Sequence, residues 1–208
     1  MSLEQEIKLQ ITTHDKIDIS ILPWSDKFVV GDIETSHLIS TYFDTPKLYL
    51  MNHNVGLRLR QSGGVWFQTV KNSGTVKDGL HQRDEWEYEL NSAEFDLEKL
   101  KQTPLKEMMA DPEIWPNLIT VFTTDFIRQT IQLSLPNNTQ IELAYDRGEI
   151  TAGNKVQVIH EIELELKTGS INELTQLAVK VSALLPVEYS DVSKAKLGYQ
   201  MLTGLASR

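Results

Sequence analysis

The sequence contains no cysteine. Disulfide bonds, thiolate catalysis and cysteine-type zinc sites are therefore excluded. It also lacks an apolar run of the roughly 18 residues that a membrane span requires. The first ten residues carry acidic side chains where a secretory signal would carry basic ones and an apolar stretch. These absences favour a soluble cytoplasmic protein with no membrane partner.

Basic residues are in the minority. The 208 residues include 20 Lys and Arg against 29 Asp and Glu, which gives a formal net charge of −9. A nucleic-acid partner is disfavoured, because neutralising phosphates requires a basic surface. A small anionic ligand is still possible, because it responds to the local charge of a cleft. With 40% hydrophobic residues, the chain can build one core, and we expect a single domain over residues 1–208.

Most of the chain alternates between polar and apolar residues with period two, which predicts strands. The expected strands are residues 4–11, 37–44, 56–60, 65–71, 83–90, 125–135, 139–146 and 160–167. Turns are expected at Gly63-Gly64, Pro136–Asn138 and Arg147-Gly148. Roughly eight antiparallel strands can close into a barrel. The pattern therefore predicts an α+β fold with an antiparallel sheet.

Three helices are expected, at residues 93–101, 170–185 and 193–205. Ser170 is a good N-cap for the second, and Glu173 would complete a capping box. Its apolar residues recur at helical spacing, so it can cover one face of the sheet.

The charged faces of the strands are sorted by sign. Arg58 and Arg60 share one face of their strand, and Glu161, Glu163 and Glu165 share one face of another. A two-layer sheet with its charged face in water is the ordinary interpretation. However, aligned like charges repel unless something neutralises them. A divalent cation would neutralise the glutamates, and an anion with several oxygens the arginines. We therefore expect a closed barrel with a charged lumen, with the aliphatic faces turned outward under helices.

Several motifs carry a resemblance to a known family. The ExExK pattern from Glu4 to Lys8 resembles the signature of the CYTH, or triphosphate tunnel metalloenzyme, superfamily. Further segments are similar to the family's motifs in the same order: Tyr42–Pro46, Leu57–Arg60, Thr69–Lys71, Glu161–Leu166 and Ser193-Lys194. Gly79–Arg83 and Thr124–Arg128 look closest to bacterial inorganic triphosphatases. Those proteins often carry a further helical CHAD domain, which we expect either to be absent here or to lie outside the 208 residues of this sequence.

The resemblance implies a tunnel with two groups of ligands. Phosphate oxygens would be bound by Lys8, Arg58, Arg60, Lys71, Arg83, Arg128 and Lys194. Mg²⁺ or Mn²⁺ would be held by Glu4, Glu6, Glu161, Glu163, Glu165 and Asp146. The catalytic set would comprise Glu4, Glu6, Lys8, Lys71 and Glu85. His81 lies two residues after Gly79 and is interpreted as a loop residue rather than a base. Residues 14–24 are too short and too β-branched for the long helix that the family places after its first strand.

The implied activity is metal-dependent hydrolysis of inorganic triphosphate to pyrophosphate and phosphate, by a monomer or homodimer. The alternatives are a thiamine or nucleoside triphosphatase, or an adenylyl cyclase, of the same superfamily. An organic group would need an aromatic platform, and none of Trp24, Trp66, Trp86 and Trp115 is clearly placed in the lumen. A non-catalytic polyphosphate-binding module is a further alternative, but it would lose the metal carboxylates that this chain keeps.

Overall fold

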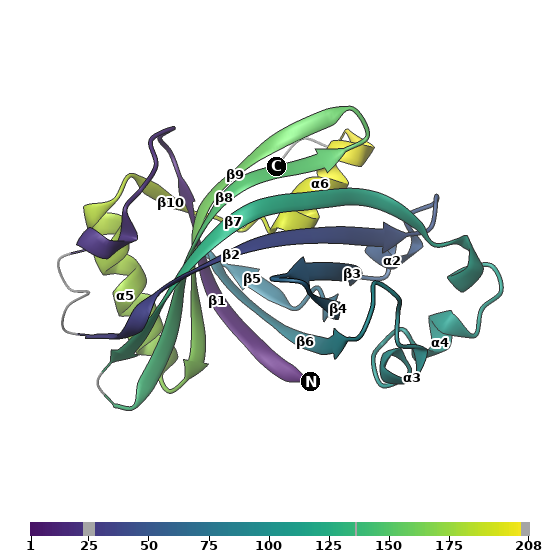
Figure 1. Cartoon of the computed structure of the whole chain (residues 1–208), viewed down its shortest axis with the longest axis horizontal. Helices are drawn as coiled ribbons and strands as arrows, with labels where there is room; N and C mark the ends of the chain where they lie inside the picture. The colour runs from purple at the N-terminus through teal and green to yellow at the C-terminus, as the bar shows by residue number, and fades with distance from the viewer. Residues whose placement is uncertain (23–27, 136, 205–208) are drawn as a thin grey trace.

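The computed structural model describes residues 1–22, 28–135 and 137–204, and these residues form a closed antiparallel barrel (Figure 1). Around the ring the strands are β1 (Ser2–Ile11), β9 (Lys155–Thr168), β8 (Thr139–Ala152), β7 (Ile119–Leu135), β2 (Val29–Asp44), β3 (Val55–Ser62), β4 (Val65–Asn72) and β6 (Leu80–Leu90). Pairing of β6 with β1 closes the ring. Two short strands, β10 (Val187–Tyr189) and β5 (Thr75–Lys77), pair with β1 and β6. The expected eight-stranded barrel with a charged interior is confirmed.

The strand alternation decides which side chains face the interior. Along β1, Ile7 and Leu9 are buried in an outer core, whereas Glu4, Glu6 and Lys8 point inward. Neighbouring strands continue the pattern, since Lys8 lies opposite Glu163 of β9 in the register. Period-two patterning therefore produces the two faces that the sequence predicts.

Helix α5 (Ile171–Leu184) covers the outer face of β1, β8 and β9. Its buried side chains are Leu174, Leu177, Ala178 and Val181. Ser170 caps it by accepting a hydrogen bond from the Asn172 backbone N–H (3.2 Å). The predicted capping box is wrong in its second half, because the Glu173 carboxylate accepts from the Asn137 amide instead (3.2 Å).

A second outer core lies over β3, β4 and β6. It contains Leu57, Val70 and Trp86, covered by Leu100 and Leu105. The covering elements are α3 (Leu97–Leu100), α4 (Lys106–Met109) and the 3₁₀ turn η2 (Trp115–Asn117), together with α2 (Tyr49–Asn52). The predicted helix over 93–101 is reduced to a single turn. The Asp96 side chain accepts hydrogen bonds from the backbone N–H groups of Glu98 and Lys99, so the helix begins only at Leu97.

The last helix, α6 (Lys194–Thr203), packs on the inner face of the barrel. Gly198 lies so close to Phe122 that a Cβ atom would come within 2.4 Å of the ring. Tyr199 packs edge-on against the same ring, with centroids 5.1 Å apart. The expectation that aliphatic faces point only outward is therefore wrong in part, because Phe122, Phe126 and Ile150 face inward and pack with α6.

One other local prediction differs from the structure. Arg147-Gly148 is not a turn but lies inside β8, where a Cβ atom on Gly148 would come within 2.1 Å of the Asp125 carbonyl oxygen. The hairpin turns instead at Gly153, with φ of +59°. After β1, the described part of residues 14–24 contains only the 3₁₀ turn η1 (Ile19–Ile21). This agrees with the prediction that the segment forms no long helix. Trp24, Pro136 and Leu205 lie outside the described residues.

No helix among the described residues has the length and apolar character needed to cross a membrane.

Candidate active site

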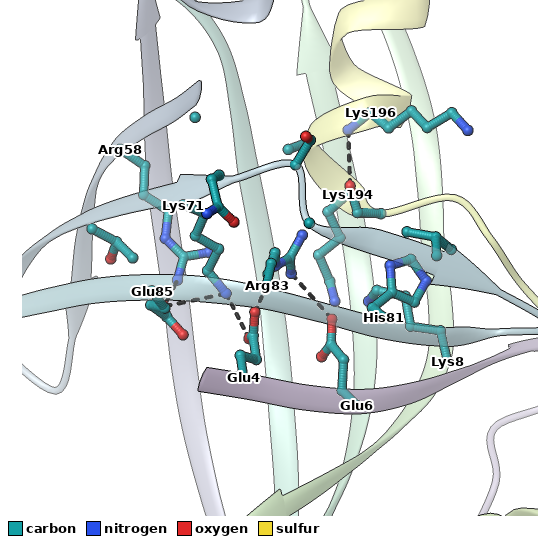
Figure 2. Close-up of a pocket in the computed structure, with 18 of the residues that line it drawn as sticks. Glu4, Glu6, Lys8, Arg58, Lys71, His81, Arg83, Glu85, Lys194 and Lys196 are labelled. Atoms are coloured by element: carbon teal, nitrogen blue, oxygen red, sulfur yellow. Dashed lines mark hydrogen bonds and ion pairs between the residues drawn. The ribbon is translucent and has the colours of Figure 1, made fainter. Parts of the chain in front are cut away.

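A cavity of about 1100 Å³ occupies the interior of the barrel (Figure 2). Its basic lining residues are Lys8, Arg58, Arg60, Lys71, Arg83, Arg128, Lys167, Lys194 and Lys196. Its acidic lining residues are Glu4, Glu6, Glu85, Glu87, Glu142, Glu163, Glu165 and Asp191. Nine cations and eight carboxylates nearly balance, so a highly charged anion could not enter alone without leaving excess negative charge.

Glu4 is held between two cations. Lys71 Nζ donates to Glu4 Oε1 (2.6 Å), and Arg83 Nε donates to Glu4 Oε2 (2.6 Å). Lys71 Nζ also lies 3.2 Å from a Glu85 oxygen. Burial opposes ionisation, but the two cations outweigh it and lower the pKa of Glu4 well below its ordinary value. Glu4 is therefore a charged carboxylate that faces the cavity.

Glu6 is poorly neutralised by comparison. Its hydrogen-bond donor is Arg83 Nη2, at 3.1 Å from Oε1. Burial raises its pKa to about 7; Lys8 opposes the shift, whereas Glu163 and Glu4 add to it. A nearby cation stabilises the charged form of a carboxylate. A buried carboxylate with a raised pKa is therefore stabilised more by a further cation than a carboxylate that is already paired.

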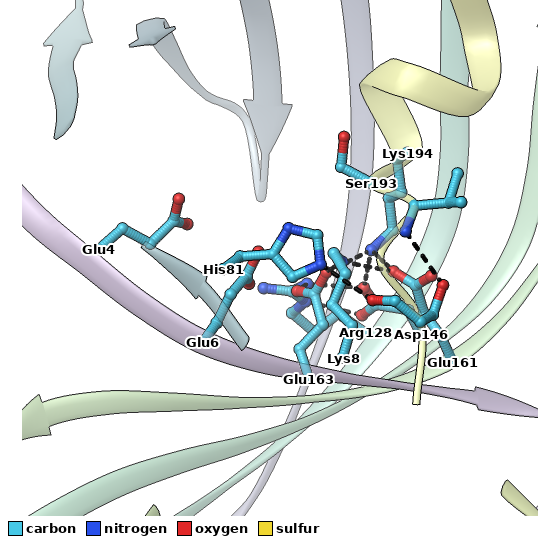
Figure 3. Close-up of polar contacts among 12 residues, drawn as sticks. Glu4, Glu6, Lys8, His81, Arg128, Asp146, Glu161, Glu163, Ser193 and Lys194 are labelled. Carbon is cyan, nitrogen blue, oxygen red and sulfur yellow. Dashed lines mark hydrogen bonds and ion pairs between the residues drawn. The ribbon is translucent and has the colours of Figure 1, made fainter. Parts of the chain in front are cut away.

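Lys194 Nζ lies among three carboxylates at the start of α6 (Figure 3). It is 2.6 Å from Asp146 Oδ2 and 2.9 Å from Glu163 Oε1, and it also pairs with Glu161. One oxygen from each of these carboxylates lies within 4.8 Å of the others, a spacing that suits a metal ion.

Two more cations occupy the same cluster. Arg128 donates to both Asp146 oxygens (2.7 and 2.6 Å) and to Glu163, and Lys8 pairs with Glu161 and Glu163. Arg128 is therefore largely buried rather than a surface charge. Asp146 and Glu161 are buried behind the cavity lining, so of these three carboxylates Glu163 is the one that faces the cavity.

Within the described part of the chain, no carboxylate hydrogen-bonds to Arg58 or Arg60. Arg58 forms two longer ion pairs, 3.5 Å from Glu87 and 3.7 Å from Glu85, and its buried Nε has no hydrogen-bond partner among the described residues. Arg60 Nε donates to the Ser40 hydroxyl (3.0 Å). Burial, Arg58 and Arg128 lower the pKa of Arg60 to about 10. Cations packed together in this way favour an anion beside them.

Sequence reasoning missed five charged residues of the lining: Glu87, Glu142, Lys167, Asp191 and Lys196. Strand parity could have found Glu87, Glu142 and Lys167, which share faces with Glu85, Asp146 and Glu165. Lys196 lies on a helix, where strand parity gives no signal.

The expectation about His81 is wrong, whereas the expectation about tryptophan agrees with the described lining. His81 lies inside β6 rather than in a loop, is 2% exposed, and lines the cavity. Although Trp24 is not described and the other tryptophans are absent from the described lining, Tyr42 and Tyr199 do line the cavity. Tyr42 stacks on Phe122 with centroids 4.4 Å apart, and both tyrosines are less than a tenth exposed. Neither therefore offers an open ring face as a platform.

The CYTH domain family model matches residues 2–199 of this chain. An inorganic triphosphatase of Haemophilus influenzae is 33% identical over 202 residues, which cover 94% of this chain. The match covers 54% of that relative, so the chain spans about half its length.

Solved structures share the fold at low sequence identity. A candidate adenylyl cyclase from Hippeastrum, described as having a dominant triphosphatase activity, matches with a TM-score of 0.62 and 18% identity over 96% of each chain. The PH1819 protein of Pyrococcus horikoshii matches with a TM-score of 0.52 and 14% identity, over 94% of this chain and 99% of its own. At such identities the likeness supports the barrel fold alone.

Proposed function

Because this chain belongs to the CYTH domain family, we propose that it hydrolyses inorganic triphosphate to pyrophosphate and phosphate inside the barrel. The observation that carries the proposal is the division of the cavity. Burial raises the pKa of Glu6 on β1 and of Glu165 on β9, whereas the arginines on β3 form no hydrogen bond to a carboxylate of the described residues. Such a site suits a polyanion that enters with a cation. The Haemophilus relative with 33% identity, an inorganic triphosphatase, supports the same substrate.

The family is metal-dependent, and the residues present suit Mg²⁺ or Mn²⁺, which prefer carboxylate oxygens. Glu4, Glu6, Glu163 and Glu165 line the cavity and would hold the ion. Asp146 and Glu161 would support it from behind, since both carboxylates are buried behind the cavity lining. When bound, the metal would supply charge neutralisation and water activation.

The cations would bind and orient the phosphate chain. Arg58 and Arg60 would grip one end, because few protein acceptors compete for their donors. Lys71, Arg83, Lys8, Arg128 and Lys194 would exchange carboxylate partners for phosphate oxygens as the carboxylates take up metal. Phosphoryl transfer depends mainly on this kind of alignment and charge neutralisation.

An inward carboxylate would accept the proton of the attacking water. Glu85 suits this role because it lines the cavity and lies 3.2 Å from Lys71 Nζ. Removing its charge would leave the fold intact, since Lys71 keeps Glu4 as a partner.

Inorganic triphosphate is expected to be preferred over ATP and thiamine triphosphate, because the two cavity tyrosines offer no open ring face. The test is phosphate release from all three compounds with Mg²⁺ or Mn²⁺. A higher kcat/KM for ATP or thiamine triphosphate would show that this compound, and not inorganic triphosphate, is the preferred substrate. Metal-dependent binding without turnover would favour the non-catalytic polyphosphate-binding module. The single domain over 1–208, the cytoplasmic location and the monomeric or homodimeric state stay predictions.

A further inference from the structure

The segment from Gly79 to Arg83 does more than supply Arg83. The backbone N–H of Gly79 donates to Asp191 Oδ1 (2.7 Å). The His81 ring nitrogen Nε2 is 2.9 Å from the Ser190 carbonyl oxygen. The start of β6 is thus joined at two points to residues 190–191, just before Lys194.

The backbone of Lys8 on β1 is held between the same two segments. Its N–H donates to the Gly79 carbonyl (2.9 Å), and its carbonyl accepts from the Ser190 N–H (3.0 Å). Three chain segments therefore meet at Lys8. Its ammonium group pairs with Glu161 and Glu163, the same two carboxylates that pair with Lys194.

Only glycine fits at position 79. Its φ is +78°, and a Cβ atom would come within 2.8 Å of Tyr189 Cδ1 and 3.1 Å of the Lys8 carbonyl oxygen. The close approach brings the Gly79 N–H within reach of Asp191.

His81 acts here as a hydrogen-bond donor. A carbonyl oxygen can only accept, so Nε2 must carry the proton. Burial lowers the pKa of His81, although the Ser190 carbonyl opposes the shift, and the ring is neutral at neutral pH. With 2% of its surface exposed, the ring is fixed in place.

We propose that Gly79, His81 and Asp191 form a clamp that positions the Lys194 ammonium group in the cavity. The proposal rests on the proposed function, in which Lys194 binds phosphate. His81 and Asp191 are positioning residues: they act on the substrate through residues 190–193 and Lys194.

Lys194 is the first residue of α6, so the segment before it sets its position. The far part of the helix is held independently. Tyr199 Oη donates to Asp44 (3.1 Å), and Gly198 lies against Phe122. Loosening the clamp would therefore move Lys194 while α6 stays folded, and small displacements of a binding group are costly for catalysis.

The test compares His81→Gln with His81→Asn. The glutamine amide nitrogen can take the place of Nε2 and keep the bond to Ser190, whereas the shorter asparagine cannot reach it. We expect kcat/KM for triphosphate to fall by about tenfold or more with asparagine and by about threefold or less with glutamine. Equal, large losses in both variants would overturn the clamp, because they would mean that His81 acts as a base.

A double-mutant cycle then asks whether His81 acts through Lys194. In a Lys194→Ala background, His81→Asn should cause little further loss. Full additivity of the two losses would contradict the proposal. Asp191→Asn, which keeps the acceptor oxygen for Gly79, should likewise retain more turnover than Asp191→Ala.

Hydrogen exchange gives a readout that does not need turnover. Amides of residues 190–197 should exchange faster in His81→Asn than in His81→Gln, while amides near Tyr199 stay protected. If the wild type failed to hydrolyse triphosphate, the proposed function would be lost but this comparison would still test the clamp. Identical exchange in the two variants would refute it.

Discussion

Glu6 on β1 and Glu165 on β9 lie directly opposite each other in the antiparallel register, and both face the cavity. Glu142 of β8 continues the row as the partner of Glu165. The nearest cations are Arg83, 3.1 Å from Glu6, and Lys167, 2.7 Å from Glu165. Like charges opposite one another destabilise a sheet. The barrel thus keeps an electrostatic cost in its lumen that a bound cation would relieve.

Glu6→Gln should stabilise the metal-free protein. The folded pKa of Glu6 is about 7, above the ordinary value of 4.5, so the folded state holds its proton more tightly than the unfolded state. Stability from Glu6 is therefore fully present below pH 4.5 and is lost as pH rises to about 7. Glutamine does not titrate, so the variant's advantage should grow across this window, up to the order of 3 kcal/mol.

The measurement is urea unfolding at pH 5 and pH 8 in the presence of a chelator. Glu94→Gln, at an exposed loop position, is the matched control and should show no such trend. A constant difference between the Glu6 variant and the wild type at both pH values would contradict the raised pKa.

Metal affinity should weaken as pH falls from 8 to 6, because protons compete for Glu6. Calorimetric titration with Mn²⁺ at several pH values measures the effect without any turnover. In Glu6→Gln the affinity should be lower overall and the pH dependence over this range flatter. An unchanged pH dependence in the variant would remove Glu6 from the metal ligands.

Glu4→Gln and Glu6→Gln should each abolish turnover while the fold stays intact. Glu6→Gln removes a negative charge from a repulsive group, so it should not lower the stability of the metal-free barrel. Glu4→Gln removes the shared charged partner of Lys71 and Arg83, so it should lower that stability without unfolding the barrel. Phosphate release at limiting metal and circular dichroism measure the two effects, again with Glu94→Gln as control. Wild-type activity in either variant would show that its metal role is assigned wrongly.

Arg60→Ala should lower kcat/KM for triphosphate by about tenfold or more, with a smaller effect on stability. Arg60 has the Ser40 hydroxyl as its protein acceptor and lies near Arg58 and Arg128, so its removal relieves repulsion. Lys180→Ala, an exposed change on α5, controls for net charge. If Arg60→Ala and Lys180→Ala behaved alike, Arg60 would lie outside the substrate site.

The sequence by itself determined the strands and their two faces, because alternation with period two is a local property. Glu4, Glu6 and Lys8 could be placed on the inner face of one strand without any knowledge of its neighbours, and so could Arg58 and Arg60. The same alternation would also have placed Glu87 and Glu142 in the cavity lining. The ExExK motif and its companions indicated the family over nearly the whole chain.

Only the tertiary structure decided which charges meet. Lys8 and Glu163 are 155 residues apart in sequence, and Lys194 reaches Asp146 from a helix that packs inside the barrel. The position of α6 and the burial of His81 followed from packing against Phe122 and the Ser190 carbonyl, which no local pattern encodes. Alternation decides on which face a side chain lies, but strand register and helix packing decide its neighbours. The pKa of Glu6, raised by burial and by Glu163, depends on those neighbours.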